Sequence, residues 1–491
     1  MKKPYTGVLL PIFSLPSSQG IGCFGKDAIQ WIDTLKSAGM NAWQVCPLGP
    51  TGFGASPYQT LSDFALNPLF LDVEDLYRRN WISKADWEKI AQTLPQDQVD
   101  YPAVEQQLMP LFFKAYEAFK QSKAKRKFEA FKDKEGEALA VFSTFCALKA
   151  KFFQKPWWEW PEKYRSYSAE TVQTYRKDYH KWVDFFAFLQ WLLHEQWHKI
   201  RCYAKKSGIT IIGDLPIYVG LDNATVWADR SLFQWNKKID CPKSVAGVPP
   251  DYFSAEGQLW GNPLYRWSEH KRTQFAWWMQ RIKKQFEWFD VLRIDHARAL
   301  FDYWAVPQGA KTAQQGEWKS GPKNDFLKKL KQNWPSMPFI LEDLGDLHEA
   351  VKTFLKTSDL PGMAIAQFAF SGENNPYLPE AWQEKQVIYT GTHDNDTTRG
   401  WFRSLSPLDQ ERVANILSVE TLTEETVSRE LIRWIFKHRT TQHVIIPFQD
   451  WLGLDSKARV NTPGTIGNNW QWRCKKTDFE RFLRDNSHLF T

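Results

Sequence analysis

The sequence predicts an α/β fold, a (β/α)8 TIM barrel with inserted, largely helical subdomains at the C-terminal face of the barrel. Eight short apolar runs rich in β-branched and aromatic residues recur along the chain, and amphipathic helical patterns lie between most of them. The runs are continuously apolar, which is typical of parallel strands covered on both faces. A doubly wound open sheet is the alternative. Eight strands, with functional side chains at several strand ends, favour the barrel.

Each expected strand ends in polar residues. In chain order the eight are Val8–Phe13, Asn41–Leu48, Thr210–Val219, Val291–His296, Pro338–Gly345, Gly362–Phe370, Gln386–Asp394 and His443–Gln449. The first expected helix, Asp27–Ala38, carries an apolar stripe and is followed by Gly39, a helix stop signal. Similar patterns occur at Phe275–Phe289, Asp325–Trp334, Leu347–Leu355 and Val427–Lys437.

Two gaps between the expected strands are too long for simple crossovers. We expect one catalytic barrel domain over residues 1–491, because a chain of this length permits a large barrel with insertions. The first gap predicts an inserted helical subdomain over residues 75–180. The second predicts a loop-rich subdomain over residues 220–270, and a long loop of this kind usually has a function, such as an active-site lid.

Composition excludes several classes of protein. Hydrophobic residues make up 43% and charged residues 24%, so the chain can bury a large core. A net charge of +7 is modest for 491 residues, and we expect neither nucleic acid nor a membrane as a partner. The six cysteines form no C-x-x-C pair, which favours a reducing compartment, and we expect a cytoplasmic protein. The 26 Trp residues exceed what a core needs, and exposed aromatic platforms for sugars or bases are one explanation.

Two short motifs are present but weak. His194-Glu195-Gln196-Trp197-His198 fits the H-E-x-x-H pattern of zinc proteases, with two His ligands and a Glu base. No third His follows at the metzincin spacing, so a zinc protease is only a remote alternative, and we expect no metal and no cofactor. Gly20-x-Gly22-x-x-Gly25 fits a dinucleotide fingerprint, but it does not follow a strand directly and is interpreted as a turn before the first helix.

Four expected strands end in carboxylates: Asp214, Asp295, Glu342 and Asp394. In a barrel these strand ends face the same mouth. One such acid could merely cap a helix, but four converging acids repel one another, and structure alone gives little reason for the arrangement. Cleavage of a glycosidic bond requires such a cluster, with one carboxylate attacking the anomeric carbon and a protonated one assisting the leaving oxygen.

The spacing of these acids suggests separate roles. Arg293 and Asp295 share a strand face, so the guanidinium would hold Asp295 ionised as a nucleophile. Glu342 and Asp343 point to opposite faces, so only one of them can be catalytic. Glu342, near other carboxylates, would have a raised pKa and stay protonated as the acid. Asp394 would stabilise positive charge on the sugar ring.

The chain resembles the 4-α-glucanotransferases of glycoside hydrolase family 77, in the α-amylase superfamily. The resemblance runs almost end to end and is least clear over Lys84–Trp160. It is carried by Ser14-Leu15-Pro16-Ser17, Pro50-Thr51-Gly52, Ser56-Pro57-Tyr58-Gln59, Asn67-Pro68-Leu69, Gly213-Asp214-Leu215-Pro216-Ile217-Tyr218-Val219, Gly247-Val248-Pro249-Pro250-Asp251, Gln258-Leu259-Trp260-Gly261-Asn262-Pro263, Arg293-Ile294-Asp295-His296, Glu342-Asp343-Leu344-Gly345, Thr392-His393-Asp394 and Asn461-Thr462-Pro463-Gly464-Thr465.

The resemblance implies a function and a set of site residues. It implies Asp295 as nucleophile, Glu342 as acid/base and Asp394 as transition-state stabiliser. The implied substrate-binding residues are Tyr58, Asp214, Gln258, Trp260, Asn262, Arg293, His296, His393 and Asn461. Residues Val248–Trp260 would close over the site. The activity would be transfer of an α-1,4-glucan segment to the 4-hydroxyl of an acceptor glucan or glucose, by a retaining double displacement through a glucosyl-Asp295 intermediate.

Three alternatives remain open at this point. An α-1,4-glucan hydrolase on the same scaffold differs only in using water as acceptor. The zinc protease predicts bound metal. A non-catalytic glucan-binding protein would keep the aromatic residues but has no reason to keep three carboxylates. The expected partners are maltooligosaccharides and amylose, and we expect a monomer or homodimer.

Overall fold

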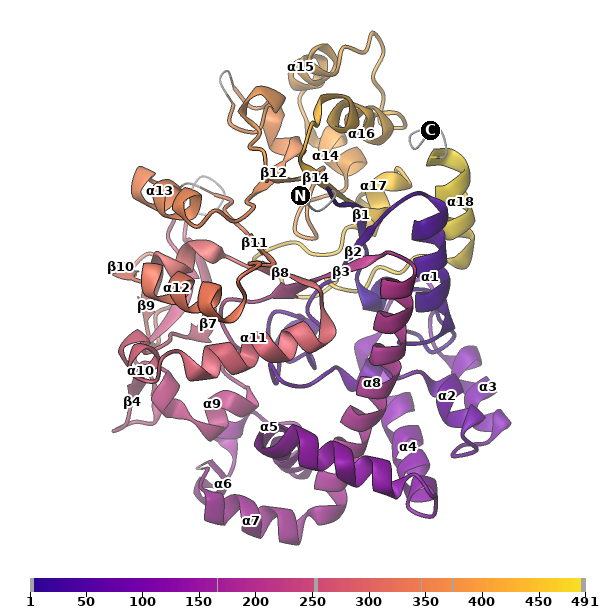
Figure 1. The fold of residues 1–491 in the computed structure, drawn as a ribbon, viewed down its shortest axis with the longest axis vertical. Coiled ribbons are helices and arrows are strands. Elements are labelled where there is room, and N and C mark those ends of the chain that lie inside the picture. Colours follow the sequence, from indigo (N-terminus) through magenta and orange to yellow (C-terminus); the bar gives the residue numbers. More distant parts are fainter. Residues whose placement is uncertain (1–3, 166, 251–254, 346, 373–374, 487–491) are drawn as a thin grey trace.

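An eight-stranded parallel sheet lies at the centre of the structure, a computed structural model (Figure 1). The structure describes residues 4–165, 167–250, 255–345, 347–372 and 375–486. The strand order is β11-β8-β3-β2-β1-β14-β13-β12. The two end strands are joined where Leu341 N–H at the end of β11 donates to the carbonyl of Pro361, 2.8 Å away and just before β12. The predicted barrel is therefore confirmed, and the open sheet is wrong.

The strands match the predicted apolar runs but are shorter. They are β1 (Thr6–Leu9), β2 (Ala42–Gln44), β3 (Thr210–Leu215), β8 (Val291–Ile294), β11 (Phe339–Leu341), β12 (Met363–Ile365), β13 (Val387–Tyr389) and β14 (His443–Pro447). Seven lie inside a predicted run and β1 overlaps one. The apolar runs continue beyond the last ladder hydrogen bond, into the segments that carry the site.

Strand β8 lies between β3 and β11 and sets the register of the site. Arg293 in β8 is opposite Asp214 in β3 and Ile340 in β11. The ring of Phe289, the residue that follows helix α11 (Ala276–Trp288), lies very close to Gly213, because a Cβ at Gly213 would lie 2.2 Å from that ring. Glycine is therefore required at this position, and it lets β3, which carries Asp214, pack tightly against Phe289.

The barrel strands alternate with helices as expected. The α-helices are α1 (Lys26–Ser37), α2 (Val73–Arg78), α3 (Lys84–Thr93), α4 (Tyr101–Phe119), α5 (Lys125–Lys151), α6 (Glu162–Arg165), α7 (Ala169–Asp178), α8 (His180–Lys206), α9 (Ala224–Ala228), α10 (Trp267–Arg272), α11 (Ala276–Trp288), α12 (Lys323–Asn333), α13 (Glu349–Thr357), α14 (Thr398–Ser404), α15 (Pro407–Leu417), α16 (Val427–His438), α17 (Phe448–Trp451) and α18 (Lys476–Asn486). The five helices predicted by name are α1, α11, α12, α13 and α16, and all are confirmed. Among the helices of the described ranges, none is long and apolar enough to cross a membrane.

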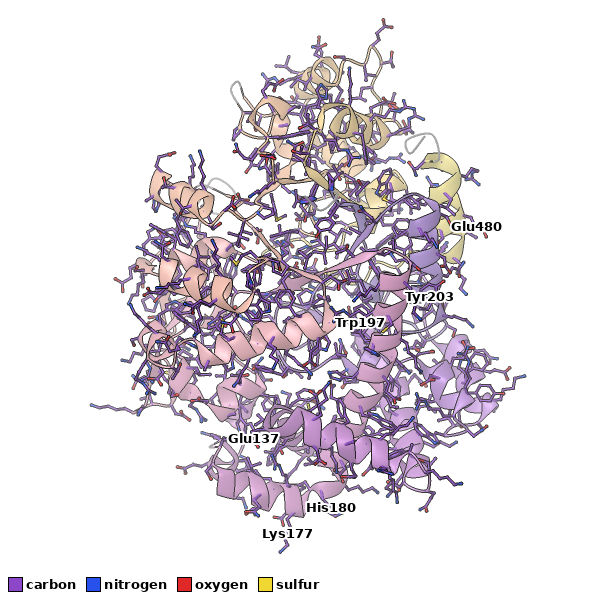
Figure 2. The ribbon with its side chains drawn as sticks, viewed as in Figure 1. Glu137, Lys177, His180, Trp197, Tyr203 and Glu480 are labelled. Atoms are coloured by element: carbon purple, nitrogen blue, oxygen red, sulfur yellow. The ribbon has the colours of Figure 1, made fainter. Side chains whose placement is uncertain are left out.

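Helix α8 connects the barrel to the helices between β2 and β3. In Figure 2 Trp197 and Tyr203 lie along its C-terminal half, beside the barrel. Trp197 is buried, and its Nε1–H donates to the carbonyl of Trp288 at 3.0 Å. The Tyr203 hydroxyl donates to Asp33 Oδ1 on α1 at 2.6 Å. The N-terminal half of α8 leaves the barrel and packs against α4, α5 and α7.

Residues 75–180 hold α3 to α7 and extend away from the barrel (Figure 1). One edge of this region is attached to the C-terminal segment. Val99 N–H donates to Gln471 O at 2.8 Å, and the Tyr101 hydroxyl donates to Trp470 O, also at 2.8 Å. The insertion therefore supports a stretch of chain that, as shown below, packs against the site. Its extent as a separate subdomain stays a prediction.

A second sheet lies beside the barrel mouth. It has the order β10-β9-β6-β7, and its strands are β6 (Ser244–Val248), β7 (Gln258–Pro263), β9 (Asp302–Pro307) and β10 (Glu317–Ser320). A small hairpin pairs β4 (Trp235–Asn236) with β5 (Cys241–Pro242). Of the expected lid, Val248–Trp260, residues 251–254 lie outside the described residues. The lid and the limits of the 220–270 subdomain stay predictions.

Candidate active site

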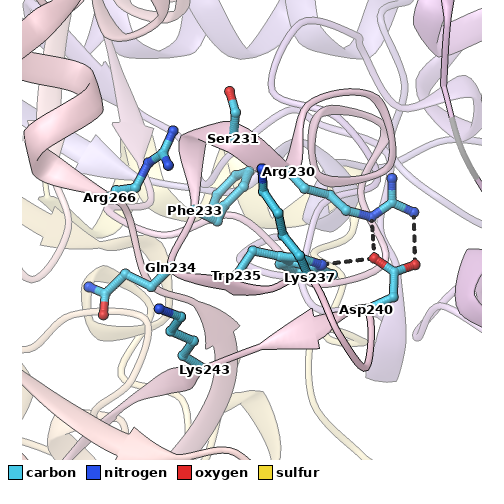
Figure 3. Close-up of a pocket in the computed structure, with 9 residues that line it drawn as sticks. All are labelled: Arg230, Ser231, Phe233, Gln234, Trp235, Lys237, Asp240, Lys243 and Arg266. Carbon is cyan, nitrogen blue, oxygen red and sulfur yellow. Dashed lines mark hydrogen bonds and ion pairs between the residues drawn. The ribbon is translucent and has the colours of Figure 1, made fainter.

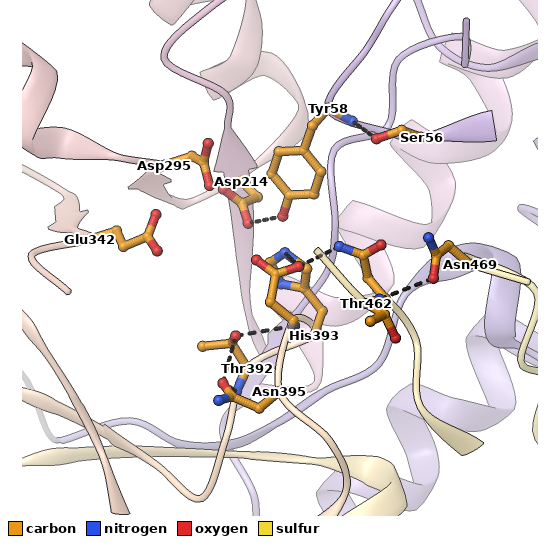
Figure 4. Close-up of polar contacts among 12 residues, drawn as sticks. Ser56, Tyr58, Asp214, Asp295, Glu342, Thr392, His393, Asn395, Thr462 and Asn469 are labelled. Carbon is orange, nitrogen blue, oxygen red and sulfur yellow. Dashed lines mark hydrogen bonds and ion pairs between the residues drawn. The ribbon is translucent and has the colours of Figure 1, made fainter. Parts of the chain in front are cut away.

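The four predicted carboxylates meet at one mouth of the barrel, where Figure 4 labels Asp214, Asp295 and Glu342 and where the charge of Asp394 acts on Asp295. Asp214 lies at the end of β3, and Asp295 directly follows β8. Glu342 directly follows β11, and Asp394 lies in the loop after β13. Each belongs to the carboxyl end of a different parallel strand, which is where a barrel presents its functional side chains. The sequence expectation that these acids converge is therefore confirmed.

Arg293 holds three of the acids together. Its Nη1 lies 2.5 Å from Asp214 Oδ2 and 3.2 Å from Asp295 Oδ1, and its Nη2 lies 3.0 Å from Glu342 Oε2. The side chains of Arg293 and Asp214 are each 1% exposed, whereas those of Asp295 and Glu342 are 24% and 20% exposed. Asp214 thus holds the guanidinium on its buried side. Asp295 and Glu342, which are partly exposed, are the two partners of Arg293 that a ligand can reach.

The protonation order of this pair differs from the sequence expectation. Burial, and then the charge of Glu342, raises the pKa of Asp295 well above its ordinary value. Burial also acts to raise the pKa of Glu342, but Arg293 and a 2.6 Å hydrogen bond from His296 N–H outweigh it, so that the pKa of Glu342 is lowered. The expectations that Arg293 keeps Asp295 ionised and that neighbouring carboxylates raise the pKa of Glu342 are therefore both wrong. The sequence does not reveal that Arg293 and the His296 amide both contact Glu342.

Asp343 faces away from the mouth, as the sequence predicts. Its Oδ1 accepts from Met363 N–H at 2.7 Å, and burial raises its pKa to about 6. A Cβ at Gly362 would lie 2.1 Å from Asp343 Oδ2, so the carboxylate is closely covered. Asp343 therefore helps join β11 to β12, and only Glu342 is available for chemistry.

Asp394 is positioned by two neighbours. Asn461 Nδ2 donates to Asp394 Oδ1 at 2.6 Å, and His393 Nε2 lies 3.4 Å from the same oxygen. The Asp394 side chain is 39% exposed, the most open of the four acids. Because it does not contact Arg293, it remains available to face a developing positive charge.

Tyr58 joins the two sides of the site. Its hydroxyl donates to Asp214 Oδ2 at 2.8 Å, and its ring stacks on His393 with centroids 5.1 Å apart and planes 14° apart (Figure 4). Burial, and then Asp214, raises the pKa of Tyr58 well above its ordinary value. Tyr58 therefore remains a neutral donor, and the structure confirms that Tyr58, Asp214 and His393 lie together.

The remaining predicted binding residues lie on β7 and after β8. Trp260 packs edge-on against His296, with centroids 4.8 Å apart, and its Nε1–H donates to Gln258 Oε1 at 3.2 Å. Burial lowers the pKa of His296 to about 4, so the imidazole is neutral at neutral pH. Asn262 is buried and donates to Val219 O at 2.8 Å. Their direct contact with a sugar stays a prediction.

Three residues missed by the sequence reasoning support the site. Gln59 Nε2 donates to Asn262 Oδ1 at 3.1 Å, and Arg459 Nη2 donates to Asp394 O at 2.7 Å. The ring of Trp470 lies against both Tyr58 and His393, at 5.7 and 5.8 Å. Gln59 adjoins Tyr58 in a motif, so that position offered a signal. Arg459 and Trp470 offered none, because only the folded C-terminal segment brings them to the barrel mouth.

The residues of the H-E-x-x-H match have separate partners. His194 Nδ1 lies 2.8 Å from Gln190 O, and burial lowers the pKa of this histidine to about 3. Glu195 pairs with Arg79 at 3.1 Å, and His198 contacts Cys202. Within the described ranges no cluster of three or more His, Cys, Asp or Glu side chains has an arrangement that could hold a metal. The motif is explained by helix packing.

The cavity in Figure 3 is distinct from this site. It has a volume of about 490 Å³ and lies around the β4–β5 hairpin. Its lining residues are Arg230, Ser231, Phe233, Gln234, Trp235, Lys237, Asp240, Lys243 and Arg266. The single carboxylate among them, Asp240, is already bound to Arg230 at 3.0 Å and to Trp235 Nε1 at 2.8 Å. The reaction needs two carboxyl groups, one as acid and one as nucleophile, and this cavity has only one, which is already paired. The cavity is therefore not the catalytic site, whatever its size.

Comparison with known proteins agrees with the geometry. A family model described as 4-alpha-glucanotransferase matches residues 10–478. The 4-alpha-glucanotransferase of Clostridium butyricum is 39% identical over 481 residues, covering 98% of each chain. The chain belongs to the 4-alpha-glucanotransferase family. Its activity is 4-alpha-glucanotransferase activity, and the resemblance seen in the sequence is confirmed.

One further relative and two solved structures are similar to the chain in sequence or in fold. The Thermus thermophilus protein is 38% identical over 477 residues, covering 95% of this chain and 94% of its own. An amylomaltase from Streptococcus agalactiae, solved in complex with acarbose, superimposes with a TM-score of 0.94 at 34% identity, covering 99% of both chains. An amylomaltase from Corynebacterium glutamicum, 19% identical, has a TM-score of 0.80 over 99% of this chain and 74% of its own, and shows the shared fold.

Proposed function

We propose that the transferase moves α-1,4-glucan segments by a retaining double displacement in which Asp295 is the nucleophile, Glu342 the acid/base and Asp394 the transition-state stabiliser. One observation carries this assignment: Arg293 contacts Asp295 and Glu342 through different nitrogens, at 3.2 and 3.0 Å. The two acids therefore flank one planar cation and titrate as a coupled pair. A retaining mechanism requires a close pair of this kind, in which one carboxylate is ionised and the other protonated.

In the first step Glu342 gives its proton to the glycosidic oxygen. The bond from that oxygen to the anomeric carbon breaks, and a bond from Asp295 to the same carbon forms. The reducing-end fragment leaves with a new 4-hydroxyl, and positive charge on the ring is greatest near Asp394. In the second step an acceptor 4-hydroxyl loses its proton to Glu342 and attacks the anomeric carbon. The bond to Asp295 then breaks, which restores the starting state.

The first step requires Glu342 to be protonated and Asp295 to be ionised. Burial acts to raise the pKa of Glu342, but Arg293 and the His296 N–H outweigh it, whereas burial and the charge of Glu342 raise the pKa of Asp295. A glycosidic oxygen that accepts a hydrogen bond from the protonated Glu342 carboxyl would favour the protonated form and raise the pKa of Glu342.

Maltooligosaccharides and amylose are the proposed donors and acceptors. Water would do the same chemistry, so the enzyme must favour a sugar hydroxyl over water at the glucosyl-Asp295 stage. Tyr58 and Trp260 are suited to this role, because each presents an aromatic ring that can cover a pyranose face. We further propose that the enzyme is cytoplasmic, which fits the cysteines left unpaired among the described residues. We also propose that it is a monomer or a homodimer.

Incubation with pure maltotriose, followed by chromatography, tests the proposal. Glucose together with chains longer than maltotriose is the expected result, and it should depend on Asp295. Glucose and maltose alone would show that water is the acceptor and would leave the hydrolase alternative. Unchanged turnover by Asp295→Asn would contradict the assignment of the nucleophile.

A further inference from the structure

The many tryptophans of this chain are mostly buried, and three of the described ones are notably exposed. They are Trp158, Trp182 and Trp318, with exposed fractions of 37%, 42% and 40%. Trp158 lies between α5 and α6 and Trp182 lies on α8, both in the region between β2 and β3. Trp318 is different, because it lies on β10, in the same sheet as β7, which carries Gln258, Trp260 and Asn262.

The ring of Trp318 is fixed by contacts with Arg298 and Trp304. The Arg298 guanidinium lies over it, 3.9 Å from the ring centroid. Trp304, the cross-strand partner of Trp318, packs edge-on at 5.2 Å, and its own Nε1–H donates to Ala313 O at 2.8 Å. Since Arg298 covers one face, the exposed surface of Trp318 belongs to the opposite face and the ring edge. A rigid, half-covered ring loses little conformational entropy when a ligand stacks on it.

Two further polar side chains, Asp302 and His348, are linked to the Arg298 guanidinium that covers the ring. Asp302 Oδ1 accepts from Arg298 Nε at 2.9 Å, and Asp302 Oδ2 lies 2.9 Å from His348 Nε2. The His348 side chain is 50% exposed. Because Asp302 already balances the charge of Arg298, the patch favours a neutral polyhydroxylated ligand over an anion. An apolar ring beside a few polar groups that accept and donate hydrogen bonds is the usual composition of such a site.

The patch lies close to His296 along the chain and in the same sheet as Trp260. Arg298 follows His296 by two residues, so their Cα atoms are at most about 7 Å apart. Strand β10 is three places from β7, a distance of about 14 Å at the usual strand spacing. A glucan of several units that is bound at Asp295 and Glu342 could therefore extend to Trp318, whereas a trisaccharide would not have to.

We propose that Trp318 is a stacking contact for α-1,4-glucan chains, outside the catalytic centre, and that it increases affinity for long chains only. The proposal rests on the proposed function, because the occupant is the enzyme's own polymeric substrate. Stacking of an aromatic face on the apolar face of a pyranose supplies the affinity, and the Arg298–Asp302–His348 group supplies hydrogen bonds to the sugar hydroxyls. No step of the transfer reaction passes through this site.

The test compares Trp318→Ala with Trp318→Phe and with Trp182→Ala. Trp182 is a matched control, because it is equally exposed and its ring is also stacked, on Phe113 at 4.9 Å. Transfer is measured with maltotriose and with long-chain amylose, and binding is measured by electrophoresis in gels containing amylose. We expect Trp318→Ala to raise the KM for amylose about tenfold, equivalent to about 1.4 kcal/mol. Kinetics with maltotriose should be unchanged, and Trp318→Phe should keep most of the affinity.

Other outcomes would overturn the proposal in distinguishable ways. An unchanged KM for amylose in Trp318→Ala would show that the ring does not bind glucan. An equal rise in Trp182→Ala would mean that surface aromatics act without a defined site. Loss of maltotriose turnover in Trp318→Ala and Trp318→Phe alike, with a lower unfolding temperature, would show that Trp318 is structural. Failure of the wild-type enzyme to rearrange maltotriose would instead contradict the proposed function itself.

Discussion

Arg293 Nη2 lies 3.0 Å from Glu342 Oε2, and this contact governs the chemistry of the site. It lowers the pKa of Glu342 against the opposing effect of burial, while Nη1 of the same guanidinium contacts Asp214 and Asp295. Because Arg293 is buried and its planar group is fixed by Asp214, the two outer acids have fixed positions relative to one another.

Replacing Asp295 by Asn should abolish transfer without unfolding the enzyme. Asn has no carboxylate to attack the anomeric carbon, so we expect kcat to fall at least about 10⁴-fold. The pKa of Asp295 is higher in the folded protein than in the unfolded chain. The unfolded chain therefore loses this proton first, and the free energy of unfolding falls as pH rises above about 4, the ordinary pKa of Asp. The substituted amide stays neutral at every pH, and urea unfolding should show the variant to be more stable than wild type at neutral pH and equal to it in acid. Lower stability of the variant across the whole range would contradict the raised pKa.

Replacing Glu342 by Gln should separate the two halves of the reaction. Gln cannot protonate a glycosidic oxygen, so transfer from maltotriose should be lost. An α-maltosyl fluoride needs no proton on its leaving group, and the variant should still release fluoride once and then stall. Mass spectrometry of a digest should find the sugar on the peptide that contains Asp295. Sugar attached to a peptide containing Asp394 or Asp214 would show that the nucleophile is assigned wrongly.

The pH profile of wild-type transfer should be bell-shaped. Below the lower pKa of the Asp295–Glu342 pair both acids are protonated and no nucleophile remains, whereas above the upper pKa no acid remains. Glu342→Gln acting on α-maltosyl fluoride should lose activity only toward low pH. A fall toward high pH that persists in this variant would assign that limb to another group.

Replacing Arg293 by Gln should affect both stability and the pH profile. Asp214 is 1% exposed and would lose its buried partner, a change that typically costs about 3–5 kcal/mol of the free energy of unfolding. Without the cation, ionisation of Asp295 and Glu342 becomes harder, so the acid limb of the remaining activity should move to higher pH. Denaturant unfolding and kcat/KM against pH measure the two effects. An unmoved acid limb would mean that Arg293 does not control the pair.

Tyr58→Phe should lower the free energy of unfolding while changing substrate binding little. The variant keeps the ring that stacks on His393 but removes the donor to Asp214 Oδ2. Asp214 Oδ1 already lacks a hydrogen-bond partner, so we expect a cost of about 1–3 kcal/mol in the free energy of unfolding. KM for maltotriose should change little in Tyr58→Phe and rise in Tyr58→Ala, which loses the ring. Equal KM values for the two variants would exclude a sugar-stacking role for Tyr58.

Much of the fold could be predicted from local patterns. The apolar runs at β3, β8, β11, β13 and β14 coincide with strands, because burial on both faces leaves a signal in the sequence itself. Strand lengths were overestimated, since apolar character continues beyond the hydrogen-bonded ladder. The acids at strand ends could be found for the same reason, because the barrel topology makes their convergence a consequence of strand order.

The sequence by itself determined the barrel, the strand ends that carry Asp295, Glu342 and Asp394, and the family. These follow from periodicity and from motifs, which are local. Only the tertiary structure decided that Arg293 and His296 N–H both contact Glu342, that burial and Glu342 raise the pKa of Asp295, and that Trp470 packs on Tyr58 and His393. A pKa depends on the summed distances to charges and donors from several elements, and an aromatic contact depends on where a distant segment returns. Neither the pKa nor the contact can be predicted from residues that are near one another in the chain.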